Sequence, residues 1–162
     1  MKAEFSARIE HEDTSKLKEI LENIAGFKDH YVKVGVLGDA EAHEDKEGNI
    51  IPMVMIASVH EYGLLEKNIP ERSFLRGWAK GHENEIKSFI AELEKKIEQG
   101  EMTAEQALQK LGAYGEKGVK KQFREGDFEP LKHRDGTPLI DTGQLRASIH
   151  WQVVEGNPEE GE

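Results

Sequence analysis

The sequence predicts an α+β fold, a single domain in which two long helices pack on a small, mostly antiparallel sheet. A length of 162 residues is that of one ordinary domain, and no repeat or Pro- or Ser-rich linker divides the chain. Apolar residues recur at helical spacing through two long central stretches, and short segments rich in β-forming residues lie on either side of them. We expect the domain to cover residues 1–154 and the acidic residues 155–162 to form a disordered tail.

The first predicted elements are a helix and a strand. Residues 15–25 repeat apolar side chains at i, i+3, i+4 and i+7, and Gly26 is the predicted end of this helix. Its apolar positions are Leu17, Ile20, Leu21 and Ile24. Residues 30–37 are rich in valine, which predicts a strand that ends before Gly38.

A polar stretch and an apolar stretch follow. Residues 38–49, GDAEAHEDKEGN, are acidic and lack periodicity, which predicts an exposed, mobile loop or the tip of an extended hairpin. Residues 52–62 are largely apolar, and Pro52 and Gly63 suit the first turn and the end of a helix. We expect a short buried helix over this stretch, with a strand as the alternative.

Two long helices are predicted in the centre of the chain. The first covers residues 74–99 with one apolar stripe and ends at Gly100. The second starts at Thr103, whose spacing from Gln106 is that of a capping box. Three glycines at spacings of three lie near one face of the second helix: Gly112, Gly115 and Gly118. Each is less favourable than alanine in a helix by about 1 kcal/mol, so we expect a close helix–helix approach or a bend, with a hinge or subunit contact as the alternative.

The C-terminal part is predicted to hold a loop, a short helix and a strand. Turn-forming residues fill positions 126–138. Asp141 begins the predicted helix, in which Leu145 and Ile149 are the buried positions. Residues 151–154 form the predicted final strand.

Charge and composition exclude several classes of protein. The formal net charge of −10 argues against a general nucleic-acid binder, whose affinity would rest on basic residues meeting phosphates. It suits a wall that lets DNA slide past. The chain has no apolar run long enough for a membrane span, no stretch typical of a secretory signal and no cysteine, so we expect a cytoplasmic protein.

The candidate catalytic patterns fail on spacing. Histidine stands beside acids in several places, but the residues four positions after His60 and His82 are aliphatic, so neither starts a two-histidine zinc helix. The sequence has no nucleophile elbow and no phosphate-binding glycine loop. We expect no catalysis, no metal and no cofactor, and retain a metal-dependent hydrolase as the alternative from a different class.

Four basic residues cluster in the second long helix. We expect them to favour the helix C-terminus or to form salt bridges towards another subunit, with a DNA-contacting stripe as the alternative. They are Lys117, Lys120, Lys121 and Arg124.

Two segments carry the most specific patterns. The first reads ASVHEYG over residues 57–63 and IPERSFLR over residues 69–76, and the second reads PLIDTGQLRASI over residues 138–149. Proline favours an extended residue before it, two arginines four apart can reach carboxylates, and Asp or Thr can cap a helix. These residue types build a fold and its contacts. The candidate structural and interface residues are His60, Glu61, Tyr62, Gly63, Pro70, Arg72, Phe74, Leu75, Arg76, Asp141, Thr142, Gly143, Leu145 and Arg146.

Together the two segments resemble the signatures of a phage virion morphogenesis family, the head–tail connector or tail-completion proteins of long-tailed bacteriophages. The family pattern is an apolar helix ending in His-Glu-Tyr/Phe-Gly, then Pro-x-Arg-Pro-Phe-Leu, a long helix, and Leu-Ile-Asp-Thr-Gly-x-Leu-Arg-x-Ser-Ile. The similarity keeps its order and spacing over roughly residues 34–154. Ser73 departs from the pattern, because the family often has proline there, and the acidic stretch 38–49 looks particular to this chain.

The resemblance implies a structural protein of the phage neck, found in the virion and in the host cytoplasm during assembly. It also implies a homo-oligomeric ring, hexameric like the tail, that contacts other neck and tail proteins and lets DNA pass without sequence-specific binding or membrane contact. A ring fits the modest hydrophobic fraction of 36%, because each subunit can bury apolar faces against the next. The alternatives are a tail terminator that caps the tube and a cytoplasmic adaptor.

One contact is predicted to link the two segments. Arg72 and Arg146 have Glu61 and Asp141 as their nearest candidate partners in sequence. We expect at least one of these arginines to form a partly buried, bidentate ion pair, within the chain or with a neighbouring subunit.

Overall fold

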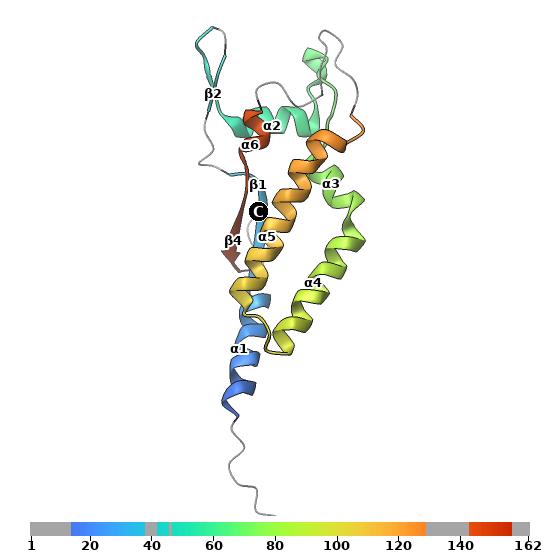
Figure 1. Cartoon of the computed structure of the whole chain (residues 1–162). Coiled ribbons are helices and arrows are strands. Elements are labelled where there is room, and N and C mark those ends of the chain that lie inside the picture. Colours follow the sequence, from blue (N-terminus) through green and yellow to red (C-terminus); the bar gives the residue numbers. More distant parts are fainter. Residues whose placement is uncertain (1–13, 38–41, 46, 129–142, 157–162) are drawn as a thin grey trace, which may run out of the picture.

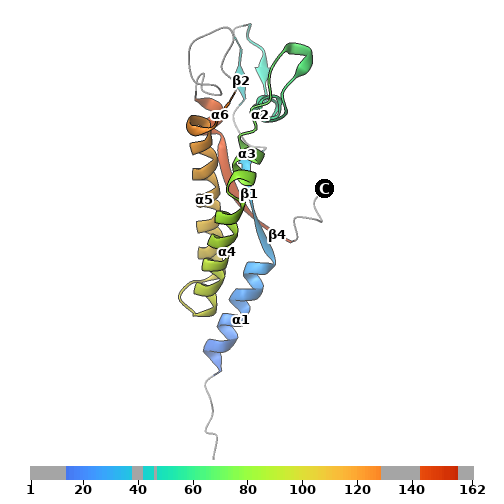
Figure 2. The ribbon, with the colours of Figure 1, turned by 90° about the vertical axis from the view of Figure 1, so that its right-hand side faces the viewer.

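The computed structural model describes residues 14–37, 42–45, 47–128 and 143–156. They form an elongated α+β domain, in which a central two-stranded sheet lies beside a long helix (Figures 1 and 2). The N-terminal helix extends from the lower end in Figure 1, and the hairpin and short helices gather at the upper end. The predicted fold class is therefore confirmed.

The central sheet joins the two ends of the chain. Strand β1 (His30–Val36) pairs antiparallel with β4 (Ile149–Glu155), so that Val34 lies opposite Trp151. The predicted strands are thus both present, and β4 extends one residue beyond the predicted domain end, because Glu155 pairs with His30. Residues 157–162 of the predicted tail lie outside the described residues.

A second, smaller sheet is a hairpin of β2 (His43–Glu44) and β3 (Ile50–Ile51). The Asp45 carboxylate holds its turn, since Oδ1 accepts hydrogen bonds from the backbone N–H groups of Glu47 and Asn49, each at 2.8 Å. Of the two structures predicted for residues 38–49, the described part forms the hairpin. Residues 38–41 and 46 lie outside the described residues.

Helix α1 (Ser15–Lys28) is longer than predicted, because it continues through Gly26 for two residues. Its Phe27 is buried and Ile24 packs beside it, against apolar residues of the two long helices. Two other residues of the predicted apolar stripe are exposed to solvent, since Leu17 and Leu21 are each 57% exposed.

Helix α2 (Met53–Tyr62) confirms the predicted helix over the stretch that was also compatible with a strand. The prediction that it is buried is only half right. Met53 and Ala57 belong to the core, whereas Val54 and Met55 on the outer face are 44% and 60% exposed. A wholly apolar run hides this difference, since both faces of the helix look alike in sequence.

The prediction of one continuous helix over residues 74–99 is wrong. The chain forms α3 (Leu75–Gly81) and α4 (Glu83–Glu98), with a break at His82, where φ is −116° and ψ is 17°. The ring nitrogen Nδ1 of His82 lies 2.9 Å from the Trp78 carbonyl oxygen, and the two rings stack with centroids 5.5 Å apart. The apolar stripe continues across the break because both helices pack on the same long helix, α5.

Helix α5 (Ala104–Glu125) begins with the predicted capping box, in which Gln106 N donates to Thr103 Oγ1 and Thr103 N donates to Gln106 Oε1. Its glycines allow other elements to pack close to the helix, which was one of the predictions made for them. A Cβ on Gly112 would lie 2.3 Å from the Trp151 ring, and one on Gly118 would lie 2.3 Å from the Trp78 ring. The central sheet contributes Trp151, so the approach is helix to strand as well as helix to helix.

Helix α6 (Gln144–Ala147) starts later than predicted, at Gln144, with Gly143 in the N-cap position at φ +78°. Asp141 and Thr142 lie outside the described residues. Leu145 and Ile149 are buried, as predicted, but Ile149 is the first residue of β4 and not a position of the predicted helix.

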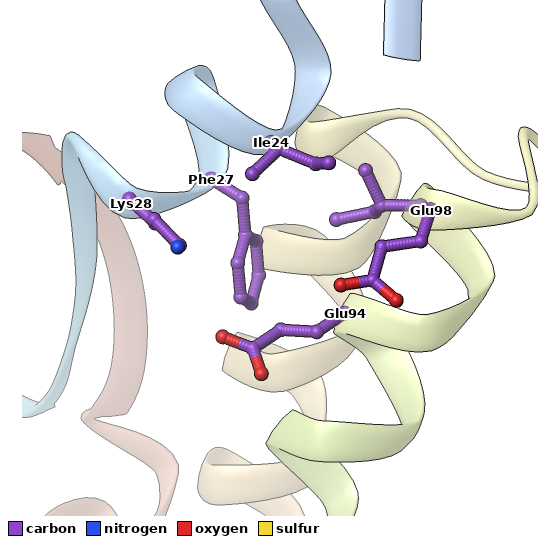
Figure 3. Close-up of a pocket in the computed structure, with 6 residues that line it drawn as sticks. Ile24, Phe27, Lys28, Glu94 and Glu98 are labelled. Carbon is purple, nitrogen blue, oxygen red and sulfur yellow. The ribbon is translucent and has the colours of Figure 1, made fainter. Parts of the chain in front are cut away.

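The buried side chains form two clusters. The upper cluster gathers α2, α3, α5, α6 and β4 around Phe74 and Phe123, which are fully buried with ring centroids 4.7 Å apart. The lower cluster joins α1, α4 and α5 around Leu93, Ile97 and Ala107. Beside it, a cavity of about 70 Å³ lies between α1 and α4, lined by apolar side chains and by Lys28, Glu94 and Glu98 (Figure 3). Within the described ranges, no helix is both long and apolar enough to cross a membrane.

Candidate functional site

The first signature segment folds back on itself after helix α2. Gly63 ends the helix with φ +74°, and a Cβ there would lie 2.9 Å from the backbone nitrogen of Glu71, so the turn requires glycine. A single 3₁₀ turn, η1 (Leu65–Lys67), leads the chain back, and Arg72 N donates a 2.7 Å hydrogen bond to the His60 carbonyl oxygen. The start of α3 is thereby placed against the end of α2.

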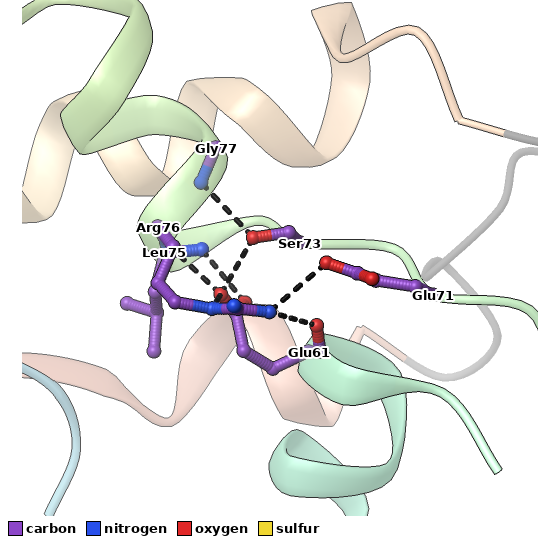
Figure 4. Close-up of polar contacts among 6 residues, drawn as sticks. All are labelled: Glu61, Glu71, Ser73, Leu75, Arg76 and Gly77. Carbon is purple, nitrogen blue, oxygen red and sulfur yellow. Dashed lines mark hydrogen bonds and ion pairs between the residues drawn. The ribbon is translucent and has the colours of Figure 1, made fainter.

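At this junction the Glu61 carboxylate caps the first turn of α3 (Figure 4). Oε2 accepts from Leu75 N at 2.9 Å, and Oε1 accepts from Arg76 N at 2.9 Å and from Ser73 Oγ at 2.7 Å. The first N–H groups of a helix have no partner within it, and a carboxylate is well suited to them. Glu61 is only 4% exposed, so this arrangement, termed the Glu61 cap, is a buried polar centre.

Arg76 completes the Glu61 cap from the solvent side. Its Nε donates to Glu61 Oε1 at 3.0 Å, and its NH2 group donates to the Glu61 carbonyl oxygen and to Glu71 Oε1, each at 2.9 Å. The guanidinium carbon also lies 4.4 Å from the centroid of the Tyr62 ring. One arginine therefore ties the end of α2, the returning loop and the start of α3 together.

The electrostatics of Glu61 are decided by competition between burial and hydrogen bonding. Burial by itself would raise the pKa of the carboxyl, but hydrogen bonds from Leu75 N, Ser73 Oγ and Arg76 outweigh it and hold the pKa below its ordinary value of 4.5. Glu61 therefore carries its charge at neutral pH, where the cap needs an acceptor.

The second signature segment reaches the same region from the other end of the chain. Leu145 and Ile149 lie in the upper core cluster with Phe74 and Ala57 of the first segment. Arg146 donates from Nε to the Lys120 carbonyl oxygen at 3.2 Å, which fastens α6 to α5. The two segments are thus joined through shared apolar packing.

The prediction that Arg72 or Arg146 forms a partly buried ion pair stays a prediction, and the structure adds an ion pair at Glu61. The arginine that pairs with the Glu61 carboxylate here is Arg76, four residues after Arg72. The Arg72 side chain is buried at 6% exposure, and Arg146 bonds to a main-chain oxygen. Asp141, the other predicted partner, lies outside the described residues.

The remaining candidate residues differ in burial. Phe74 is fully buried and Pro70 is half-buried, whereas Tyr62 is 65% exposed. Sequence reasoning missed the role of Ser73, whose hydroxyl donates to Glu61 and accepts from Gly77 N at 3.0 Å. A serine just before a predicted helix is a typical capping residue, and that signal was available.

The basic cluster of α5 contains two ion pairs within the helix. Lys120 pairs with Glu116 at 2.6 Å and Lys121 pairs with Glu125 at 3.1 Å, each at i, i+4 spacing. Among the residues that the structure describes, no group of three or more histidines and acids is placed to hold a metal ion. No family model, curated protein or solved structure matches this chain.

Proposed function

We propose that this protein is a structural component of the phage neck, which joins or completes the head–tail junction as a ring through which DNA passes. The observation that carries the proposal is the structural role of the residues that resemble the family signatures. Glu61 and Arg76 fasten α2 to α3, and Leu145 and Ile149 pack against the same core. The residues that carry the resemblance to a structural family therefore hold this chain together.

Exposed apolar side chains support the ring. Leu17 and Leu21 on α1 are 57% exposed, and Leu65 in η1 is 94% exposed, although a third of the chain is charged. Neighbouring subunits or other neck and tail proteins would remove such side chains from water, which favours assembly.

The charge supports passage of DNA. Each subunit carries a formal net charge of −10, so a ring of several copies presents a strongly negative wall. Such a wall repels phosphates and lets the duplex pass without being held.

Deletion of this gene in the phage or prophage that carries it tests the proposal. We expect DNA-filled heads and separate tails to accumulate in cells that carry the deletion. Purified protein should restore joined particles when it is added to an extract of these cells. Electron microscopy and plaque counts measure both results. Joined, infectious particles made without the protein would overturn the proposal, and tails of uncontrolled length would indicate a tube-capping terminator instead.

A further inference from the structure

The upper end of the molecule carries a group of exposed apolar side chains, with the Arg76 guanidinium as a charge beside Tyr62. Its members are Ile50 on β3, Val54, Met55 and Tyr62 on α2, and Leu65 on η1, between 44% and 94% exposed. From Ile50 to Leu65 the sequence has one Asp, Glu, Lys or Arg residue, Glu61, and it is buried. We term this set the apolar end. Depletion of charge with exposed Met and Tyr is typical of the core of a protein–protein interface.

The β2–β3 hairpin beside the apolar end is acidic, and both of its strands are short. Two residues per strand make a two-stranded hairpin marginal in water. A side-chain hydrogen bond ties it to α6, between His43 Nδ1 and Gln144 Oε1 at 2.6 Å. Glu44 and Glu47 are exposed, and the described residues of the hairpin carry three carboxylates, those of Glu44, Asp45 and Glu47. The hairpin therefore offers negative charge at the edge of an apolar surface.

A surface of opposite charge lies along helix α5. Four exposed basic side chains, at successive spacings of seven, four and three, share one face of this helix: Lys110, Lys117, Lys121 and Arg124. We term them the basic stripe. Lys121 has Glu125 beside it, whereas within the described part of the chain Lys117 and Arg124 form no ion pair. The stripe is thus available to carboxylates from outside the chain.

We propose that the acidic hairpin and apolar end of one copy dock on the basic stripe of a second copy. This inference rests on the proposed function, because it names the subunit contact of the proposed ring. Carboxylates of the hairpin meet lysine and arginine, whose methylene stems cover the adjoining apolar side chains. The contact joins two different surfaces, so its repetition continues beyond a dimer and gives a ring when the rotation between subunits closes.

Charge and area favour this partner over a symmetric pairing of two apolar ends. A symmetric pair would place two acidic hairpins side by side, and like charges oppose such a contact. The largest apolar patch of an ordinary monomer is about 300–600 Å², whereas a stable interface buries about 800 Å² on each partner. The apolar end needs the hairpin contact beside it to reach that size.

Charge reversal on each surface tests the contact. One variant carries Glu44→Lys with Glu47→Lys, and the other carries Lys117→Glu with Arg124→Glu. Each alone should self-associate about tenfold more weakly than the parent chain, since like charges then meet. An equal mixture should recover the parent assembly, because every contact between alternating subunits again joins opposite charges. Sedimentation velocity at low salt measures the assemblies, and circular dichroism checks that each variant is folded.

Two further variants serve as controls. Glu19→Lys with Glu85→Lys makes the same change in net charge as the hairpin variant, but on α1 and α4, and should assemble as the parent does. Met55→Ser with Leu65→Ser should weaken assembly while the melting temperature of the monomer stays unchanged, because both side chains are largely exposed.

The outcomes separate this contact from the function on which it rests. If the parent chain forms rings and both charge-reversed variants form them equally well, the contact is wrong and the neck function stands. If the variants dissociate but their mixture does not recover assembly, the pairing of hairpin with stripe is overturned. A parent chain that stays monomeric at high concentration also overturns it, and head–tail joining in the deletion strain then decides the function separately.

Discussion

Replacement of Glu61 by glutamine removes the charge from the Glu61 cap with almost no change in shape. The carboxylate accepts four hydrogen bonds at 2.7–3.0 Å, from Ser73, Leu75 and twice from Arg76. Glutamine offers one oxygen, and its NH₂ group would face an N–H donor that then lacks an acceptor. The substitution therefore leaves a buried donor unsatisfied at the start of α3.

The size of the effect follows from burial on the two sides of the ion pair. A stranded buried charge would cost about 3–5 kcal/mol. The Arg76 side chain is 53% exposed and can be hydrated, so this full penalty does not apply. A lost hydrogen bond to a charged acceptor and an unsatisfied donor together give a loss of about 2–3 kcal/mol. For a chain of this length, that lowers the melting temperature by about 4–12 °C.

Urea unfolding followed by circular dichroism measures the loss, and Glu71→Gln is the matched control. Glu71 bonds to the same guanidinium at 2.9 Å but its side chain is 57% exposed, so its removal should change the free energy of unfolding by about 0–1 kcal/mol. The reasoning is refuted if Glu61→Gln and Glu71→Gln unfold at the same urea concentration, because burial of the acceptor would then have no effect.

The same variant predicts a pH dependence with a definite sign. The folded-state pKa of Glu61 lies below its ordinary value of 4.5. Ionised Glu61 therefore contributes its full stability above the unfolded-state pKa, and the contribution is lost as the pH falls through the lowered folded-state pKa. The difference in unfolding free energy between the parent chain and Glu61→Gln should be constant from neutral pH to about 5.5 and shrink below 4.5. A difference that grows on acidification would contradict this sign.

Three further substitutions test the packing by the same unfolding measurement. Gly118→Ala should destabilise the chain by about 1–3 kcal/mol, because its Cβ would lie 2.3 Å from the Trp78 ring, whereas Gly81→Ala, with nothing within 4 Å, should not; equal effects would mean that close approach is not the reason for Gly118. Thr103→Ala should lose about 1 kcal/mol with the capping box, and Thr103→Ser should retain it. Phe74→Ala should lose about 3–5 kcal/mol, since the ring is fully buried, and a loss below 1 kcal/mol would contradict that packing.

Local signals in the sequence were enough for most of the elements. The valine-rich strand, the apolar helix after Pro52 and the capping box at Thr103 all lie where they were predicted, because each depends on residues close together in the chain. The break at His82 was missed because the prediction used only such local patterns. An apolar stripe that continues at helical spacing does not reveal a change in the direction of the helix.

The sequence alone determined which residue types the candidate site contains: a glutamate at the end of one helix, two arginines four apart, and a leucine and an isoleucine near the C-terminus. Only the tertiary structure decided how they are used. The turn at Gly63 brings the start of α3 to Glu61, and this placement selects Arg76 as the ion-pair partner seen at its carboxylate. Spacing along the chain fixes which side chains share a helix face, whereas partners from different elements depend on where the chain returns, and that is set by packing of the whole core.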